Sequence, residues 1–209
     1  LNRILQVIVT IYQGTAILTF ILALFLAPAW LKTPFLGAFF EQTLIKNAAG
    51  PTQPSNTWGL YDQLNLGDQL LSVNGVNVHD ATDIQNILRG VTPGTIPTKF
   101  GFSAGETIPV SVRLSTGEEK NFDVMLGIFP LADRFGYLVI PTILSAFFLI
   151  SSLWIFGLRR GESAGRAFSI FASSLAIVLG TLFDLFTTQR FTFVWTLGLT
   201  IIGGSMVDM

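Results

Sequence analysis

Four long apolar stretches constrain the fold of this chain more than any other feature of its sequence. They cover about residues 4–30, 135–158, 167–186 and 191–207. A helix that crosses the hydrocarbon core of a bilayer needs about 20 mostly apolar residues. The fourth stretch is marginal by that measure, so we expect it to continue beyond Met209. The sequence therefore predicts a membrane protein with about four transmembrane helices.

The composition supports contact with a lipid bilayer. Charged residues make up only 12% of the 209 residues, against about 25% in soluble domains. The net charge is −1 and there is no basic run, which argues against nucleic-acid binding. A cleaved signal peptide is the alternative for the first stretch, but its apolar core exceeds the roughly 7–15 residues of such peptides. Buried helices of a soluble protein are the alternative for the other three stretches.

Arginines in the short loops indicate how the spans are oriented, because basic residues beside a span resist translocation. The loop GLRRGESAGR between the second and third stretches carries three arginines, and Arg3 precedes the first stretch. The turn between the third and fourth stretches has only Arg190. We therefore expect both termini in the cytoplasm and residues 31–134 on the opposite side of the membrane.

Residues 31–134, between the first and second spans, have the composition of a soluble domain, with ten acidic and seven basic side chains. The chain is thus expected to consist of a first span over 1–30, this insert, and further spans over 135–209. The insert begins with LKTPFLGAFFEQTLI (31–45). Its apolar and aromatic character predicts an interfacial helix against the lipid headgroups. Residues 91–106 predict a long, turn-rich connection.

Alternating apolar and polar residues predict strands within the insert. TIPVSVRL (107–114) and KNFDVMLGI (120–128) alternate and are joined by STGEE, which favours an antiparallel pair. The earlier run QLLSVNGVNV contains Asn74-Gly75, a strong signal for a tight hairpin turn.

A short helix is predicted between the hairpin and the strand pair, over ATDIQNILRG (81–90). Asp80 or Thr82 can cap its N-terminus, and Gly90 ends it. The insert is therefore expected to be a small α+β domain within a membrane α-helical protein.

The run GDQLLSVNGVNVHDATDIQNIL resembles bacterial PDZ domains, in which Gly-Asp, an apolar strand, Asn-Gly, a valine and a short helix follow in order. The strand pair VSVRLSTGEEKNFDVML strengthens the resemblance. The wider arrangement is similar to the N-terminal sensor region of bacterial membrane histidine kinases and phosphatases. The resemblance implies an integral protein of the bacterial inner membrane whose PDZ-like domain lies outside the cytoplasm.

PDZ-like domains bind an extended peptide by strand addition beside the helix. The resemblance therefore makes the apolar residues of that helix candidates for either the core or a peptide groove. The family's Gly-Leu-Gly-Phe-type loop has no clear counterpart, and TWGL at 57–60 is the nearest string. The candidate peptide-binding residues are Trp58, Gly59, Leu60, Ile84, Ile87 and Leu88.

Other residues of the insert favour structural roles. Gly67, Asp68, Asn74 and Gly75 are turn residues, because glycine and asparagine tolerate positive φ and a short carboxylate caps turns. His79 is expected to be an exposed turn residue, with a pH-responsive site near Asp80 and Asp83 as the alternative.

Asp184 lies near the end of the third apolar stretch. An ionisable residue at membrane depth is a candidate functional group. An ion pair with Arg190 across the short turn is the structural alternative.

No catalytic or metal-binding motif is found in the sequence. The chain has no cysteine and a single histidine, so it lacks a His-Glu-x-x-His zinc motif and a cysteine nucleophile. Ser-His-Asp sets, Walker-type loops and Rossmann glycine patterns are also not found. We expect no enzyme activity, metal or cofactor within these residues.

Two functions remain open at this point. The first is a non-enzymatic sensing or binding module, in which the PDZ-like domain binds a peptide or partner protein and the helices transmit the signal. The second is a structural accessory subunit of a larger, energy-transducing membrane complex, with other membrane subunits as partners.

Overall fold

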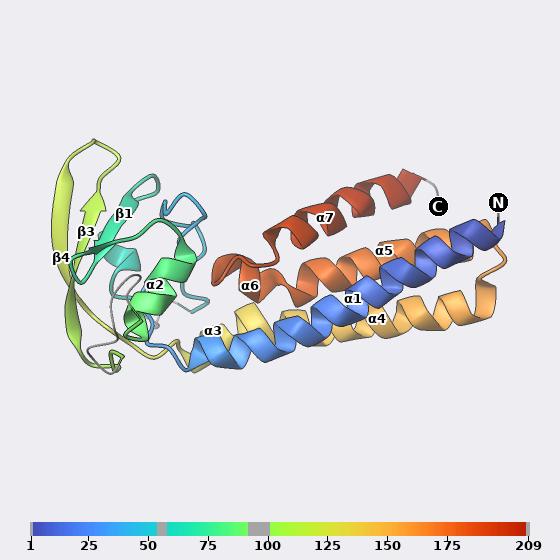
Figure 1. Ribbon diagram of the computed structural model, residues 1–209, viewed down its shortest axis with the longest axis horizontal. Coiled ribbons are helices and arrows are strands. Elements are labelled where there is room, and N and C mark those ends of the chain that lie inside the picture. Colours follow the sequence, from blue (N-terminus) through green and yellow to red (C-terminus); the bar gives the residue numbers. More distant parts are fainter. Residues whose placement is uncertain (1, 54–57, 92–100, 208–209) are drawn as a thin grey trace. The chain divides into compact units, whose positions relative to one another are not determined.

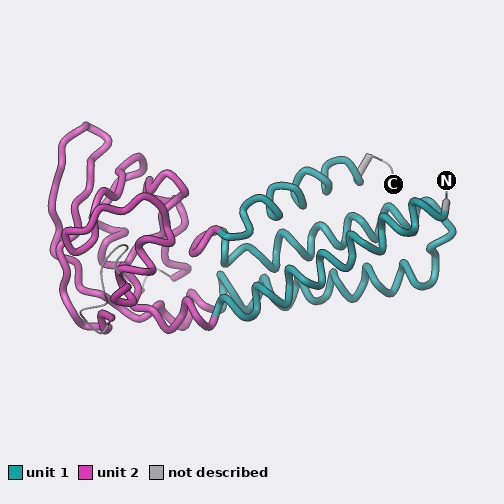
Figure 2. The backbone as a smooth tube through the Cα atoms, viewed as in Figure 1, with its two compact units in different colours: residues 1–27, 135–185, 190–209 teal, residues 28–134, 186–189 magenta. Residues whose placement is uncertain are grey.

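The computed structural model describes residues 2–53, 58–91 and 101–207 (Figure 1). The chain divides into two compact units (Figure 2). The first, here called the helical unit, comprises residues 1–27, 135–185 and 190–209. The second, here called the insert unit, comprises residues 28–134 together with 186–189. Residues 54–57 and 92–100, which include most of the predicted turn-rich connection, lie outside the described residues.

Long apolar helices dominate the chain. They are α1 (Asn2–Leu31), α4 (Ile140–Arg159), α5 (Ser163–Gly180) and α7 (Thr192–Val207). Within the described residues, three helical segments have the length and hydropathy of a membrane span, namely Arg3–Leu31, Leu131–Arg159 and Ser163–Gly180. Thr192–Ser205 is apolar but shorter. The chain therefore has the helices of a membrane protein, with three of full length.

Two prolines lie in the long helices, and the hydropathy pattern did not predict the helix geometry around them. Pro28 lies inside α1, and the helix continues for three residues beyond it, to Leu31. The second span begins with α3 (Leu131–Arg134) and a π-helical turn, η2 (Phe135–Val139). Pro141 follows directly in the first turn of α4. Because proline has no N–H to donate, the turn before it departs from α-helical bonding.

The third apolar stretch is interrupted at Thr181, between α5 and α6 (Leu182–Phe186). The Thr181 hydroxyl donates to the Ile177 carbonyl at 2.7 Å. Such a bond competes with the backbone ladder and bends or ends helices.

Small and polar side chains line the contacts within the helical unit. A Cβ at Gly180 would lie 2.7 Å from the Ser145 hydroxyl, so a larger residue there would require that hydroxyl to move. Gln13 of α1 donates through Nε2 to the Ser152 hydroxyl of α4 at 2.9 Å. The Ser152 hydroxyl in turn donates to the Ser169 carbonyl of α5 at 2.8 Å. Small residues allow such close approach, and buried polar groups then bond across helices.

The insert unit contains a four-stranded antiparallel sheet in the order β2-β1-β3-β4. The strands are β1 (Gln69–Val73), β2 (Val76–Asn77), β3 (Thr107–Arg113) and β4 (Glu119–Met125). In β3 and β4, buried residues alternate with exposed or partly buried ones. The predicted hairpin and strand pair are therefore present.

The predicted short helix is α2 (Ala81–Leu88), which follows β2. The Asp80 carboxylate caps it by accepting hydrogen bonds from the backbone N–H groups of Thr82 and Asp83, at 2.7 and 2.9 Å. The apolar side of α2 joins the core formed with the sheet, which includes Leu70, Val110 and Val124.

The interfacial helix expected over residues 31–45 is wrong. After Leu31 the segment is irregular and held by isolated bridges, such as the pair Phe35 and Gly127. Its aromatic residues are buried in the insert unit, where Phe35 and Phe39 pack edge-on against Trp58 with ring centroids 5.0 and 4.9 Å apart. The apolar character that suggested a membrane surface instead serves the core of the domain.

Candidate functional site

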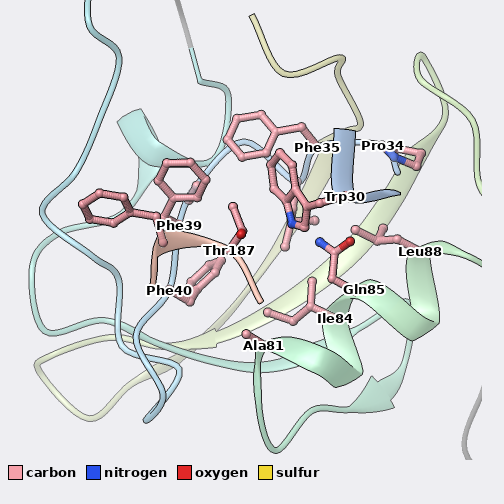
Figure 3. A pocket seen from close by; sticks show the side chains of 13 residues that line it. Trp30, Pro34, Phe35, Phe39, Phe40, Ala81, Ile84, Gln85, Leu88 and Thr187 are labelled. Carbon is pink, nitrogen blue, oxygen red and sulfur yellow. The ribbon is translucent and has the colours of Figure 1, made fainter. Parts of the chain in front are cut away.

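A groove in the insert unit lies between α2 and the irregular segment of residues 34–40 (Figure 3). We call it the α2 groove. Its lining residues are Trp30, Pro34, Phe35, Leu36, Ala38, Phe39, Phe40, Ala81, Ile84, Gln85, Leu88, Phe186 and Thr187. The open cavity measures about 30 Å³, room for about one or two waters. The groove is therefore almost entirely filled by the chain itself.

The α2 wall of the groove is apolar except for Gln85. Ala81, Ile84 and Leu88 share the helix face that the i, i+3, i+4 spacing dictates. Gln85 is only 8% exposed, and its Oε1 has no hydrogen-bond partner within the described residues. Figure 3 shows the Gln85 amide directed toward Trp30. The Gln85 amide carries both a donor and an acceptor, so this group is suited to hydrogen-bond with an incoming peptide.

The opposite wall depends on Gly37. Its φ is +89°, and a Cβ there would lie 2.9 Å from the backbone nitrogen of Leu60. The Gly37 carbonyl accepts a hydrogen bond from the Tyr61 N–H at 2.7 Å. Both the backbone angle and the close approach require glycine, so residues 34–40 are fixed against the start of the short helix η1 (Tyr61–Gln63).

The turn between α6 and α7, residues 186–189, fills one end of the α2 groove. Phe186 stacks on Phe39 with ring centroids 5.8 Å apart and an interplanar angle of 18°. Thr187 is buried among the groove residues. Gln189 donates through Nε2 to the Phe40 carbonyl at 2.6 Å. A segment between two helices of the helical unit thus belongs to the insert unit.

The predicted peptide-binding residues separate into different places. Leu60, Ile84, Ile87 and Leu88 all belong to the hydrophobic core, and Ile84 and Leu88 also line the α2 groove. Trp58 and Gly59 line a second cavity of about 310 Å³, together with residues of β4 such as Asp123 and Met125.

Trp58 is fixed by a buried carboxylate. Its indole Nε1 donates to Oδ2 of Asp133 at 2.8 Å, and Asp133 also accepts from the Thr52 N–H at 2.7 Å. Asp133 has no exposed surface. Because a buried carboxylate needs such donors, this arrangement ties residues 52 and 58 to α3.

The four predicted turn residues, Gly67, Asp68, Asn74 and Gly75, either form tight turns or stabilise one by hydrogen bonds. Asn74 and Gly75 have φ of +51° and +76°, as the two-residue hairpin turn between β1 and β2 requires. Gly67 has φ of +96°. The buried Asp68 carboxylate accepts from the N–H groups of Asn65 and Ser115, at 2.7 and 2.8 Å. These contacts join two loops at one end of the sheet.

Lys46 is a buried cation that sequence reasoning did not single out. Its Nζ donates to the carbonyls of Tyr61 (2.8 Å) and Leu64, and lies 3.8 Å from the Tyr61 ring centroid. Burial lowers the pKa of Lys46 from its ordinary value, with Asp68 and Asp62 opposing that shift. The ammonium holds η1 against the start of the sheet.

His79 and Asp184 are in contrasting surroundings. His79 has an 84% exposed side chain, 3.1 Å from Asp83. Asp184 is buried in the helical unit and accepts a hydrogen bond from the Phe191 N–H at 2.8 Å. No cluster of three or more potential metal ligands is present in the part of the chain that the structure describes.

Sequence reasoning missed the 34–40 wall, Gln85 and residues 186–189. For the wall a signal existed, because Pro34 and Gly37 interrupt LKTPFLGAFF and both residues disfavour a helix. For residues 186–189 no local signal existed, because their contacts are with segments more than 90 residues away.

Comparison with known protein families, curated proteins and solved structures finds no match to this chain.

Proposed function

We propose that this chain is a membrane-anchored sensing module in which the α2 groove of a PDZ-like insert binds an extended peptide segment of a partner protein. The observation that carries the proposal is the groove itself. It has an apolar helix on one side, an irregular backbone segment on the other, and a buried amide on the helix, that of Gln85. An extended peptide matches this chemistry, because its N–H groups are donors and its apolar side chains fit the helix face.

The proposed topology places the insert outside the cytoplasm and both termini inside, with four spans. Arginines in the loop between α4 and α5 support this orientation. The chain has no cysteine, so a single introduced thiol reports its own accessibility. A membrane-impermeant maleimide should label Asn121→Cys in intact bacterial cells, and Ser163→Cys only after permeabilisation. The reverse pattern would place the insert in the cytoplasm.

Peptide binding can be tested on the full chain in lipid nanodiscs. The probe is an array of short synthetic peptides that end in apolar residues and a free carboxylate. Ala81→Phe fills the α2 groove, so we expect it to weaken retention of the bound peptides by about tenfold or more, equivalent to about 1.4 kcal/mol. Leu66→Phe is the matched control, because Leu66 is exposed and lies outside the groove.

Two results would refute peptide binding in the groove. The first is that the Ala81→Phe chain retains the array peptides as strongly as the unmodified chain does. The other is no retained peptide at all, which would favour an accessory subunit whose insert serves only to pack.

A further inference from the structure

We infer that the turn of residues 186–189 is a built-in competitor for the α2 groove, so that peptide capture and the docked turn exclude each other. This inference rests on the proposed function. It adds a specific occupant of the groove and a route from the groove to the ends of two membrane helices.

Space is the first argument. With the turn in place, the cavity measures about 30 Å³, which is room for about one or two waters. No peptide side chain larger than that can enter beside Phe186 and Thr187, which line the groove. A peptide therefore has to displace the turn before it can lie along α2.

The contacts of the turn are the second argument, because they are of the kind that a bound peptide makes. Gln189 donates an N–H of its side-chain amide, from Nε2, to the main-chain carbonyl of Phe40 at 2.6 Å. Strand addition uses the same donor and acceptor types. Phe186 stacks on Phe39 and supplies the apolar side chain. The turn thus satisfies one groove carbonyl and covers one aromatic face.

The docked turn is also an imperfect occupant. Gln189 has φ of +56°, a conformation that residues with a Cβ rarely adopt and that persists only when surrounding contacts enforce it. A peptide that frees Gln189 from this strained conformation removes that penalty, so the two occupants can exchange.

Chain continuity gives the exchange a consequence. Phe186 is the last residue of α6, and α7 begins at Thr192. When a peptide replaces the turn, the connection between these helices loses its contacts with Phe39 and Phe40. Peptide capture is thereby transmitted to the start of α7.

The first experiment measures whether the turn covers the groove, without any peptide. Gln85→Cys places the only thiol of the chain in the groove. Gln189→Glu is nearly isosteric and replaces the amide donor by a carboxylate that repels the Phe40 carbonyl. We expect it to speed maleimide modification of the introduced thiol by about tenfold, equivalent to about 1.4 kcal/mol, in the full chain in nanodiscs. Phe186→Ala, which removes the stacked ring, is the second releasing variant.

Matched controls exist for both variants. Gln63→Glu removes a comparable amide bond, from Gln63 Nε2 to the Gly59 carbonyl at 2.9 Å, outside the groove. Phe193→Ala removes an exposed ring of α7. The controls should leave the modification rate within about twofold, less than about 0.5 kcal/mol. Equal rates in the releasing variants and the controls would overturn the inference.

The second experiment separates this inference from the proposed function. The peptide array is applied to the unmodified chain and to Gln189→Glu, each with Gln85 intact. Stronger retention by Gln189→Glu, by about tenfold or about 1.4 kcal/mol, supports the competitor. Equal retention by both overturns the competitor and leaves peptide binding standing. No retention by either overturns the proposed function, and the inference with it.

Discussion

At the scale of single residues, the insert unit depends on buried polar groups that satisfy loops with little secondary structure of their own. Lys46 donates to two carbonyls, Asp68 accepts from two loops, and Asp133 accepts from Thr52 and Trp58. Each is buried. Because an unsatisfied buried group costs more than its bond contributes, these positions should be sensitive to substitution.

Lys46→Met tests this at one position. Methionine keeps the length of the side chain but leaves the Tyr61 and Leu64 carbonyls without their donor. We expect the insert unit to lose about 1–3 kcal/mol of unfolding free energy, measured as a lowered midpoint in tryptophan-detected thermal unfolding. Lys120→Met is the control, because Lys120 is exposed on β4 and its loss should matter by less than about 0.5 kcal/mol. Equal effects of the two substitutions would contradict this role for Lys46.

The loss of stability caused by Lys46→Met should depend on pH, because the pKa of Lys46 is lowered in the folded chain. The unfolded chain holds the Lys46 proton up to its ordinary pKa of 10.5, whereas the folded chain releases it at lower pH. Between these two values the unfolded state binds more protons, so stability rises with pH there. The destabilisation caused by Lys46→Met should therefore be larger near pH 10 than at pH 8. If the destabilisation by Lys46→Met becomes smaller from pH 8 to pH 10, the pKa of Lys46 is not lowered on folding.

At the scale of elements, the groove wall of residues 34–40 requires glycine at position 37. Gly37→Ala meets both a positive φ and a backbone nitrogen 2.9 Å away, whereas Gly105→Ala meets a similar φ of +94° in open space. We expect about 1 kcal/mol of destabilisation at Gly105, and about 1–3 kcal/mol more at Gly37 because the backbone must shift. Thermal unfolding of the two variants side by side gives the difference. Equal losses of stability in Gly37→Ala and Gly105→Ala would show that the close approach to the Leu60 nitrogen does not matter.

Contacts between α1, α4 and α5 make a separate prediction. Gln13→Leu removes the amide that bonds to the Ser152 hydroxyl and carbonyl. The expected cost is about 1 kcal/mol, typical of hydrogen bonds between membrane helices. Gln6→Leu, which removes a longer bond of 3.2 Å to the Arg160 carbonyl, is the matched control and should cost less. Reversible unfolding in mixed detergent micelles measures both, and a neutral Gln13→Leu would argue against the polar contact.

Local pattern was sufficient for the elements whose formation is decided by neighbouring residues. Asn74-Gly75 predicted the hairpin, Asp80 the start of α2, and alternation the pair β3 and β4. Hydropathy located the long helices. It did not locate the break at Thr181, because that depends on a hydroxyl bonding to its own helix.

The candidate site was only partly predictable, because its walls come from three distant segments. The resemblance to PDZ domains pointed to α2, and Ile84 and Leu88 do line the α2 groove. The 34–40 wall was interpreted as membrane-facing, since aromatic residues suit both a headgroup region and a core. Phe186 and Gln189 were assigned to a membrane span and its turn, and only the tertiary fold places them against Phe39 and Phe40.

At the scale of the whole molecule, the α2 groove, the turn of residues 186–189 that occupies it and the helices α6 and α7 are connected along one chain. The insert unit includes a turn from the membrane-helix region of the sequence. If that turn competes with a peptide, the domain is more than a docking surface. Its occupied and empty states then differ at the start of α7.

A reversible lock on the turn tests this claim most directly. Thr187 and Ala81 line the same groove, and after Thr187→Cys and Ala81→Cys a mild oxidant can join the only two thiols of the chain in a disulfide, which leaves no bulky adduct after reduction. We predict that the oxidised protein in nanodiscs loses retention of the array peptides by about tenfold or more, about 1.4 kcal/mol, and regains it when a reductant opens the disulfide. Unchanged retention by the joined protein would contradict the claim that peptide and turn share the α2 groove.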